Sequence, residues 1–201
     1  MSSMTARPIA RRTARAVVIA GPNGSGKSTC ARLLLPADMV FINADMIAQE
    51  LSGEPGMAAN LRAGRILVER LDQLEDERRD FAVETTLANK KLVPRLQRLK
   101  QCGFETHLIF VYLPSSDLAV ERVAARVRAG GHDVPEDTVR RRFASGLRQF
   151  FRVYAPLVDT WRMYDNSRIA DPELIAQGRA SFPDLVSQPD VWKEIRAEWD
   201  V

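Results

Sequence analysis

A glycine-rich loop that directly follows a short apolar strand constrains the fold of this chain more than any other feature. Residues 16–20 (AVVIA) are apolar and rich in β-branched side chains, which is typical of a buried parallel strand. Residues 21–28 (GPNGSGKS) then match the pattern G-x-x-x-x-G-K-S/T of a phosphate-binding P-loop. A helix is predicted from about Ser28 to Leu35, where Pro36 ends it. Strand, loop and helix in this order predict a nucleotide-binding site.

Each position of the loop has a physical role in holding a phosphate chain. Glycines allow backbone angles that turn successive N–H groups into one anion-binding concavity, and the following helix adds the positive end of its dipole. Lys27 is expected to contact the β- and γ-phosphates, and the Ser28 hydroxyl is expected to ligate Mg²⁺. The residues predicted to bind the cofactors ATP and Mg²⁺ in this loop are Gly21, Pro22, Asn23, Gly24, Ser25, Gly26, Lys27, Ser28 and Thr29.

Apolar runs and helical patterns alternate along the rest of the chain. Four further strands are predicted, at 39–43, 80–84, 106–113 and 161–165. Helices are predicted at 57–79, at 91–101 and in two basic stretches on either side of Gly130-Gly131. This alternation predicts an α/β fold of the P-loop NTPase and nucleoside-kinase type, with a parallel sheet of about five strands, helices on both faces and a helical lid over about 116–148. The strand at 161–165 is expected to be the last, followed by a loop and a short helix near 191–199.

Composition narrows the class of protein further. The 201 residues suffice for one ordinary domain, and 45% hydrophobic with 27% charged residues excludes a disordered chain, a collagen and a coiled coil. No apolar run approaches the roughly 18 to 20 residues of a membrane helix, so no membrane partner is expected. Since Cys30 and Cys102 are the only cysteines, no disulfide framework is implied, and a cytoplasmic location is expected.

The charge is unevenly distributed along the chain. The net charge is +3, and four arginines lie in the first 15 residues, ahead of the first acid at Asp38. We predict a basic N-terminal tail over 1–15 and a single domain over 16–201. The tail is expected to be a solvated arm, and a nucleic-acid partner is not expected.

The remaining motifs separate the classes of P-loop protein. A GTPase would need an N-K-x-D element, which the sequence lacks. A motor ATPase would carry an apolar strand that ends in Asp-Glu, whereas the strand at 80–84 ends in the single Glu84. The size of the chain and its pair of basic helices favour a small-molecule kinase, whose mobile lid carries arginines.

Several segments between about Ala16 and Ser167 resemble the zeta-toxin-like P-loop kinases. They are Asn43-Ala-Asp45, Glu84-Thr-Thr86, Arg126-Val-x-x-Gly-Gly-His132-x-Val-Pro135, Arg141-Arg142 and Tyr164-Asp-Asn-Ser167. The resemblance implies an ATP-dependent phosphotransferase that transfers the γ-phosphate to a hydroxyl of a small, sugar-nucleotide-like acceptor, in the best-known cases UDP-N-acetylglucosamine. A toxin would also need an antitoxin-like protein partner, for which the sequence shows no dedicated interface.

Two carboxylates are candidates for binding or orienting the acceptor. By the resemblance, Asp45 is a catalytic residue that orients the acceptor hydroxyl and receives its proton; the alternative is a cap at the start of the next helix. Glu84 is expected to hold Mg²⁺ through water or to bind the acceptor, and the alternative is a cap on the following turn. Thr86 offers a hydroxyl to the same cleft, or it satisfies local backbone.

The lid and the last predicted strand supply the other candidates. Arg126 and Arg142, with Lys27 and Asp45, are the predicted catalytic residues, because guanidinium groups can neutralise the charge of the transferring phosphoryl group once the lid closes. Asn166 is predicted to contact the adenine, or else it belongs to a polar turn. Two other functions stay open: a kinase of another small acceptor or of a polynucleotide end, and a regulatory module that binds nucleotide without transfer.

Overall fold

The computed structural model describes residues 13–50, 57–168 and 170–200, so most of the basic tail lies outside the described residues. Seven strands form one sheet. In chain order they are Arg15–Ala20 (β1), Val40–Ile42 (β2), Phe81–Thr85 (β3), Glu105–Tyr112 (β4), Thr160–Asp165 (β5), Glu173–Arg179 (β6) and Phe182–Val186 (β7). The order in space is β2-β3-β1-β4-β5-β6-β7. The strand that precedes the P-loop therefore lies inside the sheet, between β3 and β4.

The five strands that the sequence predicted are the parallel part of the sheet. β2, β3, β1, β4 and β5 all pair in parallel, whereas β6 and β7 add an antiparallel hairpin at one edge. The expectation that the strand at 161–165 is the last was wrong. The hairpin was not predicted because Gln177 and Gly178 break the apolar pattern of β6. In addition, β7 contains Pro183 and Asp184, which are tolerated at a sheet edge.

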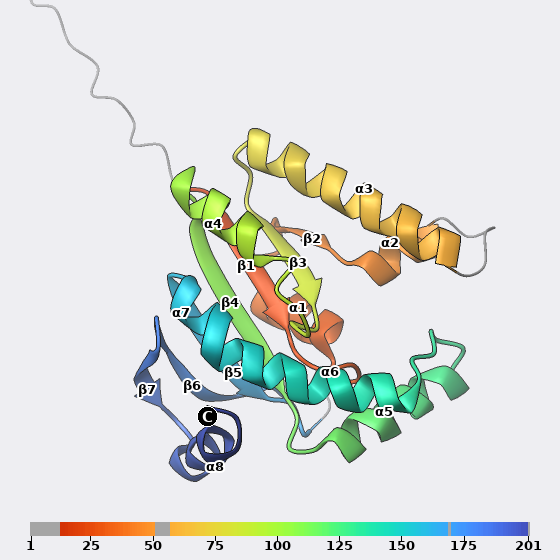
Figure 1. Ribbon diagram of the computed structural model, residues 1–201, viewed down its shortest axis with the longest axis vertical. Coiled ribbons are helices and arrows are strands. Elements are labelled where there is room, and N and C mark those ends of the chain that lie inside the picture. The colour runs from red at the N-terminus through yellow and green to blue at the C-terminus, as the bar shows by residue number, and fades with distance from the viewer. Residues whose placement is uncertain (1–12, 51–56, 169, 201) are drawn as a thin grey trace, which may run out of the picture.

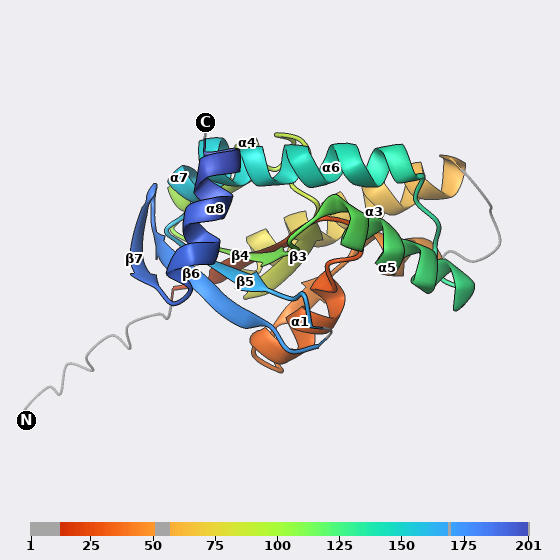
Figure 2. The ribbon, with the colours of Figure 1, turned by 90° about the horizontal axis from the view of Figure 1, so that it is seen from below.

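Helices cover both faces of the sheet, as predicted (Figures 1 and 2). In chain order they are Lys27–Leu34 (α1), Ala44–Glu50 (α2), Met57–Asp76 (α3), Val93–Gln101 (α4), Ser116–Arg128 (α5), Glu136–Gln149 (α6), the π-helix Phe150–Tyr154 (η1), Ala155–Leu157 (α7) and Pro189–Trp199 (α8). Figure 2 shows α4, α6 and α8 on one side of the sheet and α1 on the other. None of the described helices combines the length and the apolar character needed to cross a membrane.

The central strand β1 contributes side chains to two hydrophobic clusters because its successive side chains point to opposite faces of the sheet. Val18 belongs to the larger cluster, and its neighbours Val17 and Ile19 belong to the smaller one beneath α1. A strand that is buried on both faces is apolar throughout, which explains the uninterrupted run at 16–20. β1 itself begins at Arg15, whose guanidinium pairs with Asp80 at 2.7 Å, so the last residue assigned to the tail is part of the sheet.

Both helices of the predicted lid are anchored in the larger cluster, to which α5 contributes the buried side chains of Ala119 and Val123. Val139, Phe143 and Leu147 of α6 are buried in the larger cluster, so α6 is a structural layer of the domain. α6 continues into η1, where the ring of Phe150 packs edge-on against Phe110 with 5.2 Å between centroids. Closure of the α5–α6 pair stays a prediction, and its α6 half is held on the sheet.

The C-terminal helix α8 packs on the sheet. The indole of Trp192 stacks on Trp161 of β5 with ring centroids 5.4 Å apart and an angle of 19° between the rings. Trp192 and Ile195 are both buried in the larger cluster. The sequence left open whether this segment covers the acceptor cleft, and the stacking shows that it completes the core at the β5–β6 side.

Candidate active site

The P-loop runs from the end of β1 to the start of α1 and is wedged between β4 and α5. Gly21 (φ +142°) and Gly24 (φ +80°) have backbone angles that side chains rarely adopt. A Cβ atom on Gly21 would lie 2.3 Å from the carbonyl oxygen of Val111, and one on Gly24 would lie 2.6 Å from that of Ala119. Glycine is therefore required here both for the turn and for the close approach of neighbouring backbone.

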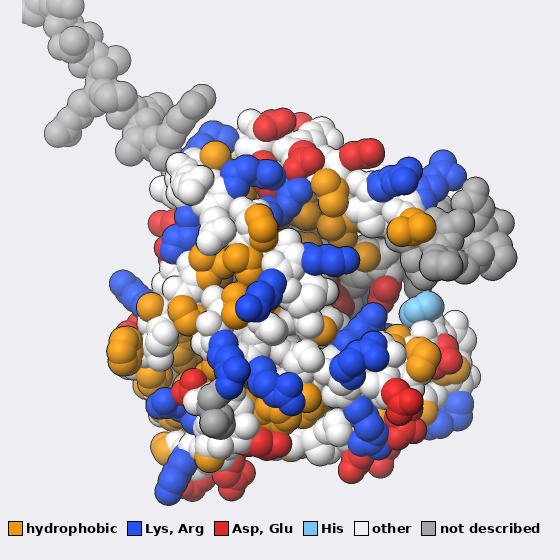
Figure 3. Space-filling view, in the orientation of Figure 1, with side chains coloured by type: hydrophobic (Ala, Val, Ile, Leu, Met, Phe, Trp, Pro, Cys, Tyr) orange, Lys and Arg blue, Asp and Glu red, His pale blue; other side chains and the backbone are white. Residues whose placement is uncertain are grey.

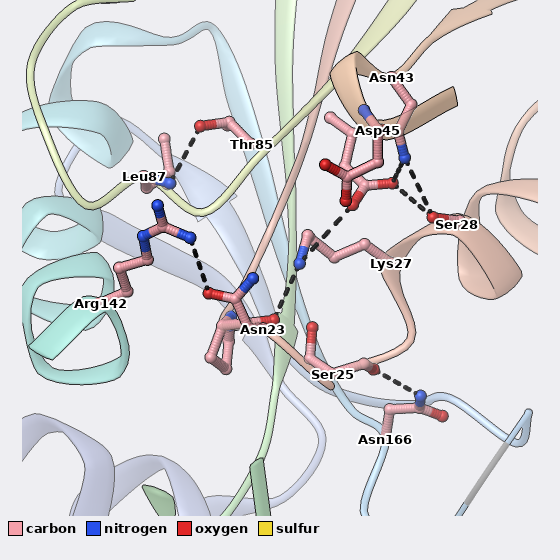
Figure 4. Close-up of polar contacts among 12 residues, drawn as sticks. Asn23, Ser25, Lys27, Ser28, Asn43, Asp45, Thr85, Leu87, Arg142 and Asn166 are labelled. Carbon is pink, nitrogen blue, oxygen red and sulfur yellow. Dashed lines mark hydrogen bonds and ion pairs between the residues drawn. The ribbon is translucent and has the colours of Figure 1, made fainter. Parts of the chain in front are cut away.

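Lys27, the first residue of α1, is only 6% exposed. Its Nζ donates a hydrogen bond of 2.8 Å to the carbonyl oxygen of Pro22 and lies 3.7 Å from Oε1 of Glu84 (Figure 4). Burial lowers the pKa of Lys27, and the charges of Glu84 and Asp45 oppose that effect. A triphosphate bound by the loop would add further negative charge beside this buried ammonium group, which Glu84 approaches no closer than 3.7 Å.

Ser28, Asn43 and Glu84 form a hydrogen-bonded triangle beside Lys27 (Figure 4). The Ser28 hydroxyl donates to Oε2 of Glu84 at 2.6 Å, and Nδ2 of Asn43 donates to the same oxygen at 2.6 Å and to the Ser28 hydroxyl at 3.2 Å. These residues come from α1, from the end of β2 and from the end of β3, which meet at the carboxyl edge of the parallel sheet.

The triangle offers the oxygen atoms that Mg²⁺ prefers, namely one hydroxyl and one carboxylate. Among the described residues, no group of three or more His, Cys, Asp or Glu side chains could hold a metal ion by itself. A magnesium ion at Ser28 and Glu84 would therefore take its other ligands from water and from the nucleotide phosphates, which is how Mg²⁺ is usually held at phosphate-transfer sites.

Asp45 lies beside the triangle in the first turn of α2, and its side chain is exposed. Its backbone N–H donates to Oδ1 of Asn43 at 2.7 Å, and the N–H of Ile47 donates to the Asn43 carbonyl oxygen. Asn43 thus caps α2, and the alternative that Asp45 is the cap was wrong. The Asp45 carboxylate does not take part in capping and is exposed to solvent.

The two lid arginines approach the P-loop from different helices. Arg142 of α6 donates to Oδ1 of Asn23 at 3.3 Å (Figure 4). Arg126 of α5 donates to the carbonyl oxygen of His132 at 2.7 Å, and within the described part of the chain its buried Nε has no hydrogen-bond partner. In Figure 3, Lys and Arg side chains line the lower wall of a hollow between α2–α3 and the α5–α6 pair. That wall carries the charge needed opposite a phosphate chain.

A cavity of about 370 Å³ is lined by most of the predicted cofactor-binding residues and by residues of α5. Lys27, Ser28 and Glu84 line this cavity, and Arg126 lines it from α5. The complete lining is Gly24, Gly26, Lys27, Ser28, Thr29, Glu84, Arg122, Ala125, Arg126, Asn166 and Ala170.

Thr86 is one predicted site residue that does not line this cavity. Its carbonyl oxygen faces α6, where a Cβ on Gly146 would lie 2.6 Å away. The neighbouring Thr85 hydroxyl accepts from the N–H of Leu87, so it satisfies local backbone. Acceptor binding by Thr86 stays a prediction.

Asn166 supports the P-loop from beneath. Its side chain is 1% exposed, and Nδ2 donates to the carbonyl oxygen of Ser25 at 2.7 Å (Figure 4). Arg122 of α5 donates to the carbonyl oxygens of Asn166 at 2.8 Å and of Ser167 at 2.7 Å. The side-chain nitrogen of Asn166 is thus already hydrogen-bonded to the P-loop. A contact between Asn166 and the adenine stays a prediction.

Sequence reasoning assigned no role to Asn43 or to Arg122. Asn43 was visible only as part of the Asn43-Ala-Asp45 motif, although an asparagine just before a helix is a cap signal. Arg122 precedes Arg126 by four residues on the same side of α5, which is the spacing of helix neighbours. Which of the many arginines in this region enters the site depends on how α5 packs, and the spacing does not encode that.

Comparison with known proteins places this fold and loop in a family. A family model described as an AAA domain matches residues 17–152, which is more than half of the chain. An uncharacterized protein of Haemophilus influenzae is 30% identical over 129 residues, which cover 64% of this chain and 92% of that relative.

Solved structures share the fold at lower identity. The AvrRxo1-ORF1:AvrRxo1-ORF2 crystal structure with sulphate ions superimposes with a TM-score of 0.73 at 14% identity, covering 91% of this chain. The same pair with ATP gives 0.70 at 15% identity. The PezAT chromosomal toxin–antitoxin system of Streptococcus pneumoniae gives 0.63 at 17% identity, covering 92% of this chain and 78% of the matched chain. This chain spans 63% of the length of the AvrRxo1 chain that it matches.

Proposed function

The chain belongs to the AAA domain family, and from this premise we propose that it is an ATP-dependent kinase that transfers the γ-phosphate to a hydroxyl of a small acceptor. The observation that carries the proposal is the meeting of Lys27, Ser28 and Glu84 in one cavity with Arg126 on the facing helix. Lysine, a magnesium-binding pair and a facing guanidinium are the parts that phosphoryl transfer requires.

The phosphate chain would lie along the P-loop, with its anionic oxygens on the backbone N–H groups and on the amino end of α1. The ammonium group of Lys27 donates one hydrogen bond to the carbonyl oxygen of Pro22. With ATP bound, it would donate this hydrogen bond or a second one to a phosphate oxygen. Because Lys27 is buried, its interaction with a phosphate is stronger than that of a solvated lysine. The fold resembles a structure that was solved with ATP, which supports the choice of nucleotide.

Ser28 and Glu84 are the residues that would hold Mg²⁺, directly or through water. When bound, the ion neutralises negative charge on the phosphates. Glu84 also lies 3.7 Å from the ammonium group of Lys27, so its carboxylate would be shared between that group and the ion, and the nucleotide phosphates would supply the rest of the negative charge.

Asp45 is proposed to orient the acceptor hydroxyl and to receive its proton. Asp45 is exposed and is not needed as a helix cap. It is connected to the Ser28–Glu84 pair by Asn43, whose side chain is hydrogen-bonded both to the Asp45 N–H and to Glu84. Phosphoryl transfer depends on positioning more than on a strong base, and a carboxylate is sufficient for that.

Arg126 and Arg142 are proposed to stabilise the phosphoryl group in transfer. Arg126 has a buried Nε that lacks a protein partner in the described chain, and a phosphate oxygen is the kind of acceptor that such a group can take. Arg142 already contacts the loop through Asn23 and can exchange that contact for the nucleotide.

For the acceptor we propose a sugar-nucleotide-like molecule. The Lys and Arg side chains along the hollow in Figure 3 favour a negatively charged acceptor over a neutral one. The resemblance of Asn43-Ala-Asp45 and the 126–135 segment to zeta-toxin-like kinases supports the same class.

A transfer assay tests this proposal. Purified protein is incubated with ATP labelled at the γ-phosphate and with a panel of nucleotide sugars, free sugars and oligonucleotides. Label on a nucleotide sugar, absent with Lys27→Ala, is the expected result. Label on an oligonucleotide end alone would instead make the protein a polynucleotide kinase. Tight ATP binding without any transfer would make it a regulatory module.

We also propose an antitoxin-like protein partner, because the AvrRxo1-ORF1:AvrRxo1-ORF2 pair and the PezAT toxin–antitoxin system share this fold. Such a partner would have to block the ATP cavity or the α5–α6 pair. Expression of the wild-type chain alone should then slow bacterial growth, and the Lys27→Ala variant should not. Equal growth of both strains at equal protein levels would argue against a toxin.

A further inference from the structure

Asn43 is the residue at which the nucleotide side and the acceptor side of the site meet. Its side chain is 6% exposed and uses both ends of the amide. Nδ2 donates to Oε2 of Glu84 at 2.6 Å and to the Ser28 hydroxyl at 3.2 Å, while Oδ1 accepts from the N–H of Asp45 at 2.7 Å. One planar group therefore joins the end of β2 with α1 and β3.

The cap role by itself does not explain why this residue is asparagine. Serine, threonine and aspartate cap a helix about as well, since each has an oxygen that accepts from the first turn. Of these four residues, only asparagine also carries a side-chain nitrogen that can donate in the opposite direction. Aspartate would place a second carboxylate against Glu84. The hydroxyl of threonine can donate, but its oxygen is attached to Cβ, one bond nearer the backbone than Nδ2 of asparagine, so while it accepts from the first turn it does not reach Glu84 as the amide nitrogen does.

The contacts of Glu84 show what the nitrogen does. Oε2 accepts from both Ser28 and Asn43, so two donors fix its position beside the Ser28 hydroxyl. Oε1 lies toward Lys27 at 3.7 Å. Asn43 thus orients the carboxylate so that one oxygen faces the hydroxyl and the other faces the ammonium group.

We propose that Asn43 is a positioning residue: its amide nitrogen holds the Glu84 carboxylate in register with Ser28, and its amide oxygen holds Asp45 at the start of α2. The relative placement of the magnesium-binding pair and the acceptor-orienting carboxylate is then set by one side chain. This inference rests on the proposed function, because it assigns Ser28 and Glu84 to Mg²⁺ and Asp45 to the acceptor.

The test uses equilibrium binding, so that it does not depend on knowing the acceptor. A non-hydrolysable ATP analogue is titrated into the full-length protein by calorimetry at a series of Mg²⁺ concentrations. The decisive variant is Asn43→Thr, which keeps an oxygen for the cap and removes the nitrogen donor. The matched control is Asn89→Thr, because Asn89 is exposed and Oδ1 there makes the same kind of bond, to the N–H of Lys91.

The association constant of the analogue is plotted against Mg²⁺ concentration, and the Mg²⁺ concentration at half of its maximum should rise roughly tenfold in Asn43→Thr. A shift of this size is what the loss of one hydrogen bond to a charged group implies. The melting temperatures of Asn43→Thr and Asn89→Thr should both stay close to that of the wild type. An unchanged Mg²⁺ requirement in Asn43→Thr would overturn the inference, and so would an equal shift in Asn89→Thr.

A second variant tests the oxygen half of the proposal. Asn43→Ala removes the cap as well, so hydrogen exchange of the Asp45 N–H should accelerate in Asn43→Ala but not in Asn43→Thr. Equal exchange in all three proteins would show that Asn43 does not hold Asp45. If the wild type binds the analogue with Mg²⁺ yet transfers no phosphate to any acceptor, the proposed function fails while the role of Asn43 stands. If the wild type shows no Mg²⁺-dependent binding, both fail.

Discussion

The hydroxyl of Ser28 donates a hydrogen bond of 2.6 Å to the carboxylate of Glu84, across 56 residues of sequence. The contact is possible because β1 and β3 are neighbours in parallel register, with Ile19 opposite Glu84. The P-loop leaves the end of one strand and the carboxylate stands at the end of the next. The pair that we propose to hold Mg²⁺ is thereby assembled from two segments that are far apart in the sequence, and neither segment alone indicates the other.

Replacing Glu84 with glutamine tests that pair. Glu84→Gln keeps the shape of the side chain and removes its charge, so the Mg²⁺-dependent turnover of ATP should fall roughly 10- to 100-fold. The measurement is the rate of ATP consumption as Mg²⁺ is titrated. Glu105→Gln is the control, since that carboxylate is 56% exposed at the opposite end of the sheet. An unchanged Mg²⁺ dependence in Glu84→Gln would remove Glu84 from the metal site.

Asp45→Asn separates chemistry from folding. Because Asn43 is the cap and Asp45 is exposed, the substitution should leave the melting temperature within a degree or two. The kcat for phosphoryl transfer should fall by about 100-fold or more, the usual contribution of a positioned base, while affinity for an ATP analogue is retained. Equal turnover of wild type and variant would cancel the assignment.

The lowered pKa of Lys27 predicts how nucleotide binding responds to pH. The charged ammonium group is the form that binds phosphate, and burial brings its pKa below the ordinary value of 10.5. Affinity for the ATP analogue should therefore begin to fall, as pH rises, at a lower pH than a solvated lysine would give. Calorimetry between pH 7 and about pH 10.5, repeated with Lys27→Met, measures this. The variant should bind weakly with little change attributable to this group, and a wild-type affinity that stays flat up to 10.5 would contradict the prediction.

The same shift has the opposite sign for stability. Between the lowered pKa of folded Lys27 and 10.5, the unfolded chain binds more protons than the folded one, so this residue makes the free energy of unfolding rise with pH in that window. Lys27→Met should lack that contribution. The difference between the two proteins in urea midpoint, measured across the window, isolates it from the other titrating groups.

Gly146→Ala tests the contact between α6 and the segment after β3. The added Cβ would lie 2.6 Å from the carbonyl oxygen of Thr86, which is backbone and cannot rotate away. Alanine gains up to about 1 kcal/mol of helix propensity over glycine, but overpacking a core contact costs about 1–3 kcal/mol. We expect a net loss of stability of about 1–2 kcal/mol in chemical denaturation. Gly64→Ala on α3, where nothing lies within 4 Å of the added atom, should stabilise instead.

The errors of the sequence-based predictions are instructive. Most of the parallel strands were located because they are apolar runs, as burial on both faces requires, whereas β5 alternates between buried Trp161 and Met163 and the exposed Arg162. The β6–β7 hairpin was missed because an edge strand with one exposed face tolerates Pro183 and Asp184, and its pattern resembles that of a loop. The role of the Thr86 hydroxyl stays a prediction, while the close approach of its carbonyl oxygen to Gly146 of α6 involves a backbone atom that every residue has, so nothing in the sequence indicates it.

Glycine spacing, apolar runs and helical periods are local properties of the chain, so the P-loop and the layers of the fold could be predicted from them. The meeting of Ser28, Asn43 and Glu84 became visible in the folded chain alone, as did the approach of Arg126 and Arg142 to the loop from two helices. The reason is that these contacts depend on the strand order β2-β3-β1 and on how α5 and α6 pack. Strand order follows from the pairing and packing of the whole sheet, and no segment of the chain carries that information alone.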